Sequence, residues 1–157
     1  MATENKNLST YDKYSLPSVV GKRVGIITSQ WNGQITNNMR KGAVDTLLDC
    51  GFSPENIIEW SVPGAFELVN GAKRMIEEAV DAVIVIGCVI QGETKHFDFV
   101  CQGVTYGIAH LNATQDIPVI FCVLTDNTLQ QSIDRSGGKH GNKGIEAAIT
   151  AIQMIDL

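Results

Sequence analysis

Short apolar runs alternate along this chain with longer segments that mix apolar and polar positions. Four runs have the length and the β-branched content of buried strands, and turn-forming glycine, proline, asparagine or aspartate residues bound them. They cover residues 23–29, 56–62, 81–87 and 118–125. The third run is apolar at consecutive positions, as expected where helices cover both faces of a parallel sheet. We therefore expect it to be a central strand.

Apolar side chains three and four positions apart predict helices between and after these strands. In the first helix these positions are Ile35, Met39, Ala43 and Leu47, and Gly51 is placed to end it. The helical segments are residues 35–51, 65–79, 99–113, 128–136 and 144–155. Strands that alternate with helices in this way predict the α/β class, with a parallel sheet and right-handed crossovers.

A chain of 157 residues has the length of one domain. Its 44% hydrophobic and 18% charged residues exclude a disordered protein, and no apolar run reaches the length of a membrane span. Residues 1–20 are polar without a sustained period, so we expect an N-terminal tail before a domain at residues 21–157. The start lacks the basic-then-apolar order of a secretory signal, which leads us to expect a cytoplasmic protein.

The net charge of −5 disfavours nucleic acid as a partner, because a polyanion would be repelled. The four cysteines lie far apart, with no C-x-x-C pair and no histidines at zinc spacing. We expect reduced cysteines in the core and no metal site.

Ligands of open parallel sheets bind at the carboxyl ends of the strands, where loops and helix N-termini converge. Three side chains in these loops could have a role in ligand binding or catalysis, and each could also have a purely structural role. His96 could move protons near neutral pH, or it could be an exposed loop histidine. Trp31 could stack on a planar ligand, or it could close the core at the end of the sheet. Glu67 could accept hydrogen bonds from hydroxyl groups, or it could favour the helix dipole.

A second candidate site is a glycine-rich segment that contains Arg135, Lys139, His140 and Lys143. Clustered cations and exposed backbone N–H groups suit a phosphate, although a flexible connection between two helices has the same composition. The glycines match neither G-x-x-x-x-G-K-[ST] nor G-x-G-x-x-G after a strand. ATP and NAD are therefore poor candidates for the ligand.

Four blocks together resemble, in order and spacing, the signature of the 6,7-dimethyl-8-ribityllumazine synthase family. They are VPGAFEL, GCVIQGETKHFDFV, IFCVLT and DRSGGKHGNKGIEAA, and the resemblance covers roughly residues 22–156. It implies a flavodoxin-like three-layer sandwich, with a four-stranded parallel sheet between helices. The implied reaction condenses 5-amino-6-(D-ribitylamino)uracil with 3,4-dihydroxy-2-butanone 4-phosphate and releases phosphate and water. It is the penultimate step of riboflavin biosynthesis, and no metal or cofactor is implied.

The resemblance also implies a role for each matching residue at the pyrimidine end of the site. Trp31 would stack on the pyrimidine, where the family more often has phenylalanine. The backbone of Ala65 and Phe66 and the carboxylate of Glu67 would hold the ring and the ribityl chain. Phe121 would come from the adjacent subunit. The other edges of the ring would meet Cys88, Val89 and Ile90.

At the phosphate end, Glu93 and Thr94 match the phosphate-binding turn, and Arg135 matches the guanidinium partner of the phosphate. Lys143 matches a second cation, and His96 matches the proton-transfer residue. The carboxylate of Glu93 is unfavourable beside a phosphate, so we expect its backbone N–H to make the contact. Gln91 stands where many relatives carry arginine, so no charge is expected from that position.

The family further implies a homopentamer with active sites between neighbouring subunits. The short connection between Arg135 and Lys143 is similar to that of members that form sixty-subunit capsids, and riboflavin synthase is a further expected partner. Two other functions remain open from the residues. A flavin-binding or storage protein would keep Trp31 without needing His96, Arg135 and Lys143 together, and a purely structural shell protein would need none of these residues.

Overall fold

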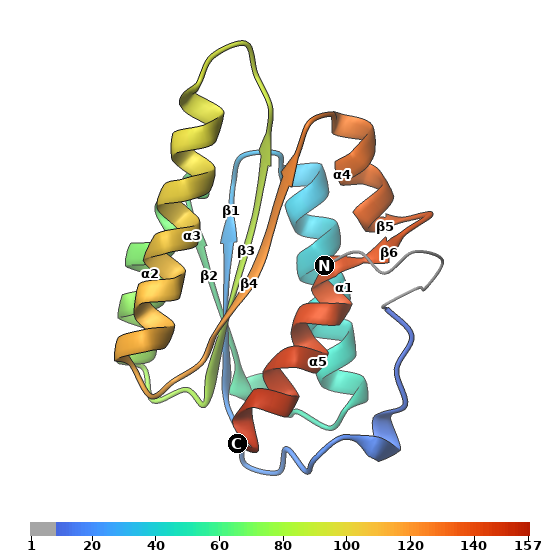
Figure 1. The fold of residues 1–157 in the computed structure, drawn as a ribbon. Coiled ribbons are helices and arrows are strands. Elements are labelled where there is room, and N and C mark those ends of the chain that lie inside the picture. Colours follow the sequence, from blue (N-terminus) through green and yellow to red (C-terminus); the bar gives the residue numbers. More distant parts are fainter. Residues whose placement is uncertain (1–8) are drawn as a thin grey trace.

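The computed structural model describes residues 9–157, which form three layers around a four-stranded sheet (Figure 1). All neighbouring strands are parallel, in the order β2-β1-β3-β4. The four strands are β1 (Val24–Ser29), β2 (Ile57–Val62), β3 (Ala82–Ile90) and β4 (Val119–Asp126). The predicted α/β class and four strands are confirmed, and the third strand is central as expected.

In the described part of the chain, five α-helices cover the two faces of the sheet. Helices α2 and α3 lie over one face, and α1 and α5 lie over the other, with α4 above α5 in the view of Figure 1. Their bounds are α1 (Gly33–Asp49), α2 (Leu68–Ile76), α3 (His96–Thr114), α4 (Leu129–Arg135) and α5 (Lys143–Ile155). Two short 3-10 helices are η1 (Lys13–Ser15) and η2 (Pro54–Asn56).

Alternate residues of each central strand supply two separate cores. Ile26 and Ile84 pair across β1 and β3 and pack under α1 and α5, whereas Ile27 and Val85 pair one residue later and pack under α2 and α3. All four side chains are fully buried. Both faces of these strands are apolar because each face carries a helical layer. This burial explains why the apolar runs in the sequence are continuous.

The glycine-rich segment after α4 forms a β-hairpin of β5 (Ser136–Gly138) and β6 (Gly141–Asn142). Gly137 and Gly141 have φ values of 119° and 82°, a conformation that side chains other than glycine rarely adopt. The segment therefore has a defined hairpin conformation that depends on these two glycines. The hairpin fixes how α4 leads into α5.

The N-terminal residues that the structure describes lie against the domain. Val19 is 5% exposed and packs in the core beneath α1 and α5. Tyr11 and Lys13 contact the Asp49 carboxylate, and Ser9 exchanges hydrogen bonds with the Asn142 backbone. Residues 1–8 of the predicted tail lie outside the described residues.

The four cysteines are free thiols. Cys88 and Cys122 are buried as expected, but Cys50, which follows the last residue of α1, and Cys101, which lies within α3, are only half-buried. Within residues 9–157, no helix is both long and apolar enough to cross a membrane. The same residues contain no cluster of three or more side chains suited to a metal ion.

Candidate active site

A cleft of about 680 Å³ opens at the carboxyl ends of the strands. It lies where the strand order reverses between β1 and β3, the position at which doubly wound sheets bind their ligands. Eight of the residues singled out in the sequence line it together, and they come from the loops after β1 and β2, the end of β3 and the start of α3. They are Trp31, Ala65, Phe66, Glu67, Cys88, Val89, Ile90 and His96.

Three exposed aromatic side chains surround this cleft. Trp31 is 72% exposed, Phe66 is 57% exposed and Phe99 is 66% exposed. The alternative that Trp31 belongs to the core is therefore wrong. Large aromatic rings gathered around an opening are typical of sites that bind a planar ligand or a partner.

Trp31 is held in place by its backbone. Its N–H donates to the carbonyl oxygen of Pro63 at 3.3 Å, which ties the end of β1 to the end of β2. The next residue, Asn32, has a left-handed conformation with φ of 57°, and its side-chain amide donates to the Cys88 carbonyl oxygen at 2.9 Å. These bonds connect the ends of three neighbouring strands directly beside the indole.

Glu67 precedes α2 but its side chain does not cap the helix. The carboxylate instead turns back towards Gly64, where an added Cβ atom would lie 2.8 Å from Glu67 Oε2 and 3.5 Å from Trp31 Cδ1. Only glycine leaves this space free. Glu67 lines the cleft, and carboxylate oxygens accept hydrogen bonds from hydroxyl donors, although the position at a helix N-terminus also favours the charge.

His96 is the first residue of α3, and its side chain is exposed at the edge of the cleft. Its backbone N–H lies 3.4 Å from the Thr94 hydroxyl, which orders the entry to the helix. Glu93 and Thr94 are exposed in the loop before it and do not line the cleft itself. An exposed imidazole with room on its solvent side is suited to proton transfer with a bound molecule.

Cys88 contributes a neutral thiol to the floor of the cleft. Burial raises the pKa of the Cys88 thiol above its ordinary value, an effect that the hydrogen bond to Ser132 partly opposes. The Ser132 hydroxyl in turn donates to the Asp126 carboxylate at 2.7 Å. Because only the thiolate is a good nucleophile, this raised pKa disfavours attack by Cys88 on a ligand.

The residues expected at the phosphate end lie apart from this cleft. Phe121 and Lys143 line a separate groove of about 280 Å³ between β4 and α5. Arg135 lies at the end of α4 and reaches towards the same groove through Glu146, which also lines it. In a single chain, the structure therefore brings the predicted residues together as two groups and not as one site.

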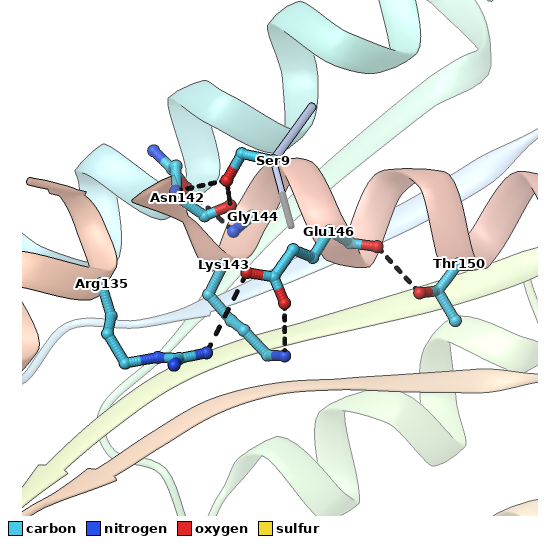
Figure 2. Close-up of polar contacts among 7 residues, drawn as sticks. All are labelled: Ser9, Arg135, Asn142, Lys143, Gly144, Glu146 and Thr150. Carbon is cyan, nitrogen blue, oxygen red and sulfur yellow. Dashed lines mark hydrogen bonds and ion pairs between the residues drawn. The ribbon is translucent and has the colours of Figure 1, made fainter. Parts of the chain in front are cut away.

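The three cations of the glycine-rich segment, Arg135, Lys139 and Lys143, also divide between two places. Arg135 and Lys143 both point to Glu146, at 4.0 Å and 2.8 Å (Figure 2). Lys139 instead pairs with Asp134 at 3.2 Å. Arg135 and Lys143 are thus paired with the same carboxylate, whereas Lys139 is separate from them.

Sequence reasoning missed Asn32, Gly64, Phe99 and Glu146. Asn32 and Gly64 stand within two of the loop segments that follow strands, so the strand-end rule pointed to their location but not to their role. Phe99 is an aromatic residue outside the apolar stripe of its helix, which was a usable signal. Glu146 carries no such signal, because its partners depend on how the hairpin folds.

Comparisons with known proteins agree with the resemblance. The sequence model of the 6,7-dimethyl-8-ribityllumazine synthase family matches residues 21–157. The chain is 65% identical to the 6,7-dimethyl-8-ribityllumazine synthase of Flavobacterium johnsoniae, over 98% of this chain and 82% of the relative. It is 58% identical to the protein of the same name from Christiangramia forsetii, over 100% of this chain and 95% of the relative. The chain therefore belongs to the 6,7-dimethyl-8-ribityllumazine synthase family.

Proposed function

We propose that this chain condenses 5-amino-6-(D-ribitylamino)uracil with 3,4-dihydroxy-2-butanone 4-phosphate to form 6,7-dimethyl-8-ribityllumazine. The observation that carries this proposal is the gathering of eight expected residues around one cleft, in a chain whose relatives bear the name of that enzyme. Phosphate and water leave in the reaction, which is the penultimate step of riboflavin biosynthesis.

The aromatic cleft takes the pyrimidine in this proposal. The exposed indole of Trp31 stacks on the ring, and the carboxylate of Glu67 accepts hydrogen bonds from the ribityl hydroxyls. The backbone of Ala65 and Phe66 holds the ring. Its remaining edges meet Cys88, Val89 and Ile90.

The chemistry requires several proton transfers but no permanent nucleophile. The amine attacks the ketone, a first water leaves to form an imine, and phosphate departs by elimination. The ribitylamino nitrogen then closes the ring onto the remaining carbonyl carbon, and a second water leaves. His96 is positioned at the edge of the cleft to move protons during these steps. Holding two reactants in the productive orientation contributes up to roughly 7 to 11 kcal/mol in favourable cases, so positioning supplies much of the acceleration.

The phosphate end comes from a second copy of the chain. Phe121, Arg135 and Lys143 lie at the β4 edge and not in the cleft of the same chain, so a complete site needs a neighbour. Arg135 then binds the phosphate through its guanidinium and stabilises charge as the phosphate leaves, with Lys143 nearby. Glu93 and Thr94 contribute the turn beside His96. This division supports the pentamer that the family resemblance implies.

The compact hairpin between Arg135 and Lys143 supports assembly of pentamers into a sixty-subunit capsid, with riboflavin synthase as a further partner. The same proposal places the enzyme in the cytoplasm. All four cysteines are free thiols, as expected for a reducing compartment.

The proposal is tested by mixing the purified protein with both substrates and following the fluorescence of the lumazine product. We expect saturable formation of the lumazine, well above the rate in buffer alone. A flavin-binding protein would bind riboflavin without accelerating the reaction, and a structural shell would do neither. A rate equal to that in buffer would refute the proposed activity.

A further inference from the structure

Glu146 bridges the two cations at the β4 edge (Figure 2). Its Oε2 lies 2.8 Å from Lys143 Nζ, and its Oε1 lies 4.0 Å from Arg135 Nη2. The Glu146 side chain is 11% exposed, while the Lys143 and Arg135 side chains are each 23% exposed. One little-exposed carboxylate therefore stands between two cations that are more accessible than it is.

The charges of this trio do not balance. The positive charges of Lys143 and Arg135 repel each other, and the Glu146 carboxylate offsets that repulsion. The two cations in turn offset the loss of hydration that burial causes at the carboxylate. One positive charge remains. Most of the three N–H donors of Lys143 and the five of Arg135 also remain available, since Glu146 faces one nitrogen of each. The trio is thus suited to an anion that approaches from outside.

The backbone beneath Glu146 has little freedom to move. Asn142 Oδ1 accepts a hydrogen bond from the Gly144 N–H at 2.9 Å and so caps α5. A Cβ atom on Gly144 would lie 1.8 Å from the Met39 carbonyl oxygen, so α5 begins in direct contact with α1. Ser9 further fixes Asn142 from outside. This frame sets where the first turn of α5, and therefore Glu146, lies.

We propose that Glu146 is a positioning residue for the phosphate end of the site. It holds Lys143 and Arg135 at a fixed separation, so that both cations meet the phosphate of the four-carbon ketone in a single arrangement. Glu146 itself does not touch the substrate. This inference rests on the proposed function, because that function assigns the phosphate to these two cations.

The test replaces Glu146 by glutamine, which keeps the size of the side chain and removes its charge. We expect the KM for the phosphorylated ketone to rise about tenfold, because a cation that is no longer held in place loses one charge-assisted interaction with the phosphate, a net loss of about 1.4 kcal/mol after the gain from removing the negative charge. The KM for the pyrimidine should stay within about twofold, because the cleft is untouched. Glu146→Asp keeps the charge on a shorter side chain and should give an intermediate KM for the ketone.

Asp45→Asn is the matched control. It neutralises a carboxylate that pairs with Lys41 on the exposed face of α1, so both KM values should stay as in the wild type. Equal KM values in Glu146→Gln and wild type would overturn the positioning role, as would a parallel rise for both substrates. If Glu146→Gln does not fold, as judged by thermal unfolding, the same comparison with Glu146→Asp decides the question.

Binding of inorganic phosphate, measured by calorimetry, separates this inference from the proposed function. We expect phosphate to bind the wild-type assembly about tenfold more tightly than it binds Glu146→Gln. A protein that binds phosphate in this way but forms no lumazine would refute the function and keep the positioning role. Equal phosphate affinity in the two proteins would refute the positioning role even in an active enzyme.

Discussion

The side-chain amide of Asn32 donates a hydrogen bond to the backbone carbonyl of Cys88 at 2.9 Å, across the point where the strand order reverses. The two residues are 56 positions apart: Asn32 lies in the turn between β1 and α1, and Cys88 lies near the end of the neighbouring strand β3. Asn32 adopts a left-handed backbone conformation that asparagine tolerates better than most residues. The bond and the turn together fix the position of Trp31 over the cleft.

Replacing Asn32 therefore tests how the aromatic platform is held. Asn32→Ala should lower the free energy of unfolding by about 2 kcal/mol, with about 1 kcal/mol from the hydrogen bond and about 1 kcal/mol from the left-handed backbone. It should also raise the KM for the pyrimidine. Denaturant unfolding and steady-state kinetics measure the two effects.

Asn32→Gly separates these contributions, because glycine tolerates the backbone conformation and lacks the amide. It should retain more stability than the alanine variant while showing the same rise in the KM for the pyrimidine. If the alanine variant were as stable as the wild type, the hydrogen bond would have no role in holding the turn.

His96→Ala should slow lumazine formation by roughly 10²-fold or less, because general acid–base catalysis contributes a moderate factor and the substrates remain positioned. Single-turnover kinetics would show the loss in the chemical step with little change in substrate binding. His110→Ala is a suitable control, since His110 is exposed on the same helix and lies outside the cleft. Equal rates for the two variants would contradict a proton-transfer role for His96.

Arg135→Ala should chiefly weaken the use of the phosphorylated ketone, because the variant removes the only planar guanidinium proposed to meet the phosphate. The KM for the ketone should rise at least tenfold, with the pyrimidine KM nearly unchanged. Lys139→Ala removes a neighbouring cation that pairs with Asp134 instead, and it should behave as the wild type. A similar loss in both variants would indicate general attraction of anions by the hairpin.

The sequence predicted the fold where local patterns were strong. Strand β3 was recognisable because both of its faces are covered, and the rule that ligands bind at strand ends brought Trp31, Glu67 and His96 to one cleft. The β5–β6 hairpin was not predicted, because its few residues contain little besides glycine and polar side chains. Glu146 was missed for the same reason, since its two partners are positioned by that hairpin.

Contacts between distant parts of the chain also could not be predicted from the sequence. The bond between Ser9 and Asn142 joins residues 133 positions apart, and neither residue has an unusual neighbourhood in the sequence. The family resemblance matched Phe121 and Lys143 to residues of the site. The structure shows that they lie in a groove separate from the cleft. The resemblance already implied a site shared between neighbouring subunits, and this geometry supports that proposal.

Trp31 offers a larger aromatic surface than the phenylalanine more common at its position, and 72% of it is exposed. We expect the wild-type protein to bind riboflavin more tightly than Trp31→Phe does, since the flavin is a larger ring system than the pyrimidine and stacks over more of the indole. Fluorescence titration of riboflavin measures both affinities. Equal dissociation constants would remove any special role for the indole in flavin binding.

The size of the assembly depends on the segment between Arg135 and Lys143, which the structure folds into a tight hairpin. Sedimentation velocity should show the wild-type protein as a species far heavier than five chains of 17.0 kDa each.

Inserting four glycine and serine residues between Lys139 and His140, at the exposed tip of the hairpin, should leave active pentamers. Activity survives because the insertion does not touch the pairing of Arg135 and Lys143 with Glu146. A wild-type protein of pentamer mass at every concentration and in every buffer would contradict the capsid. An insertion variant that still forms a species far heavier than a pentamer would show that the hairpin does not control assembly.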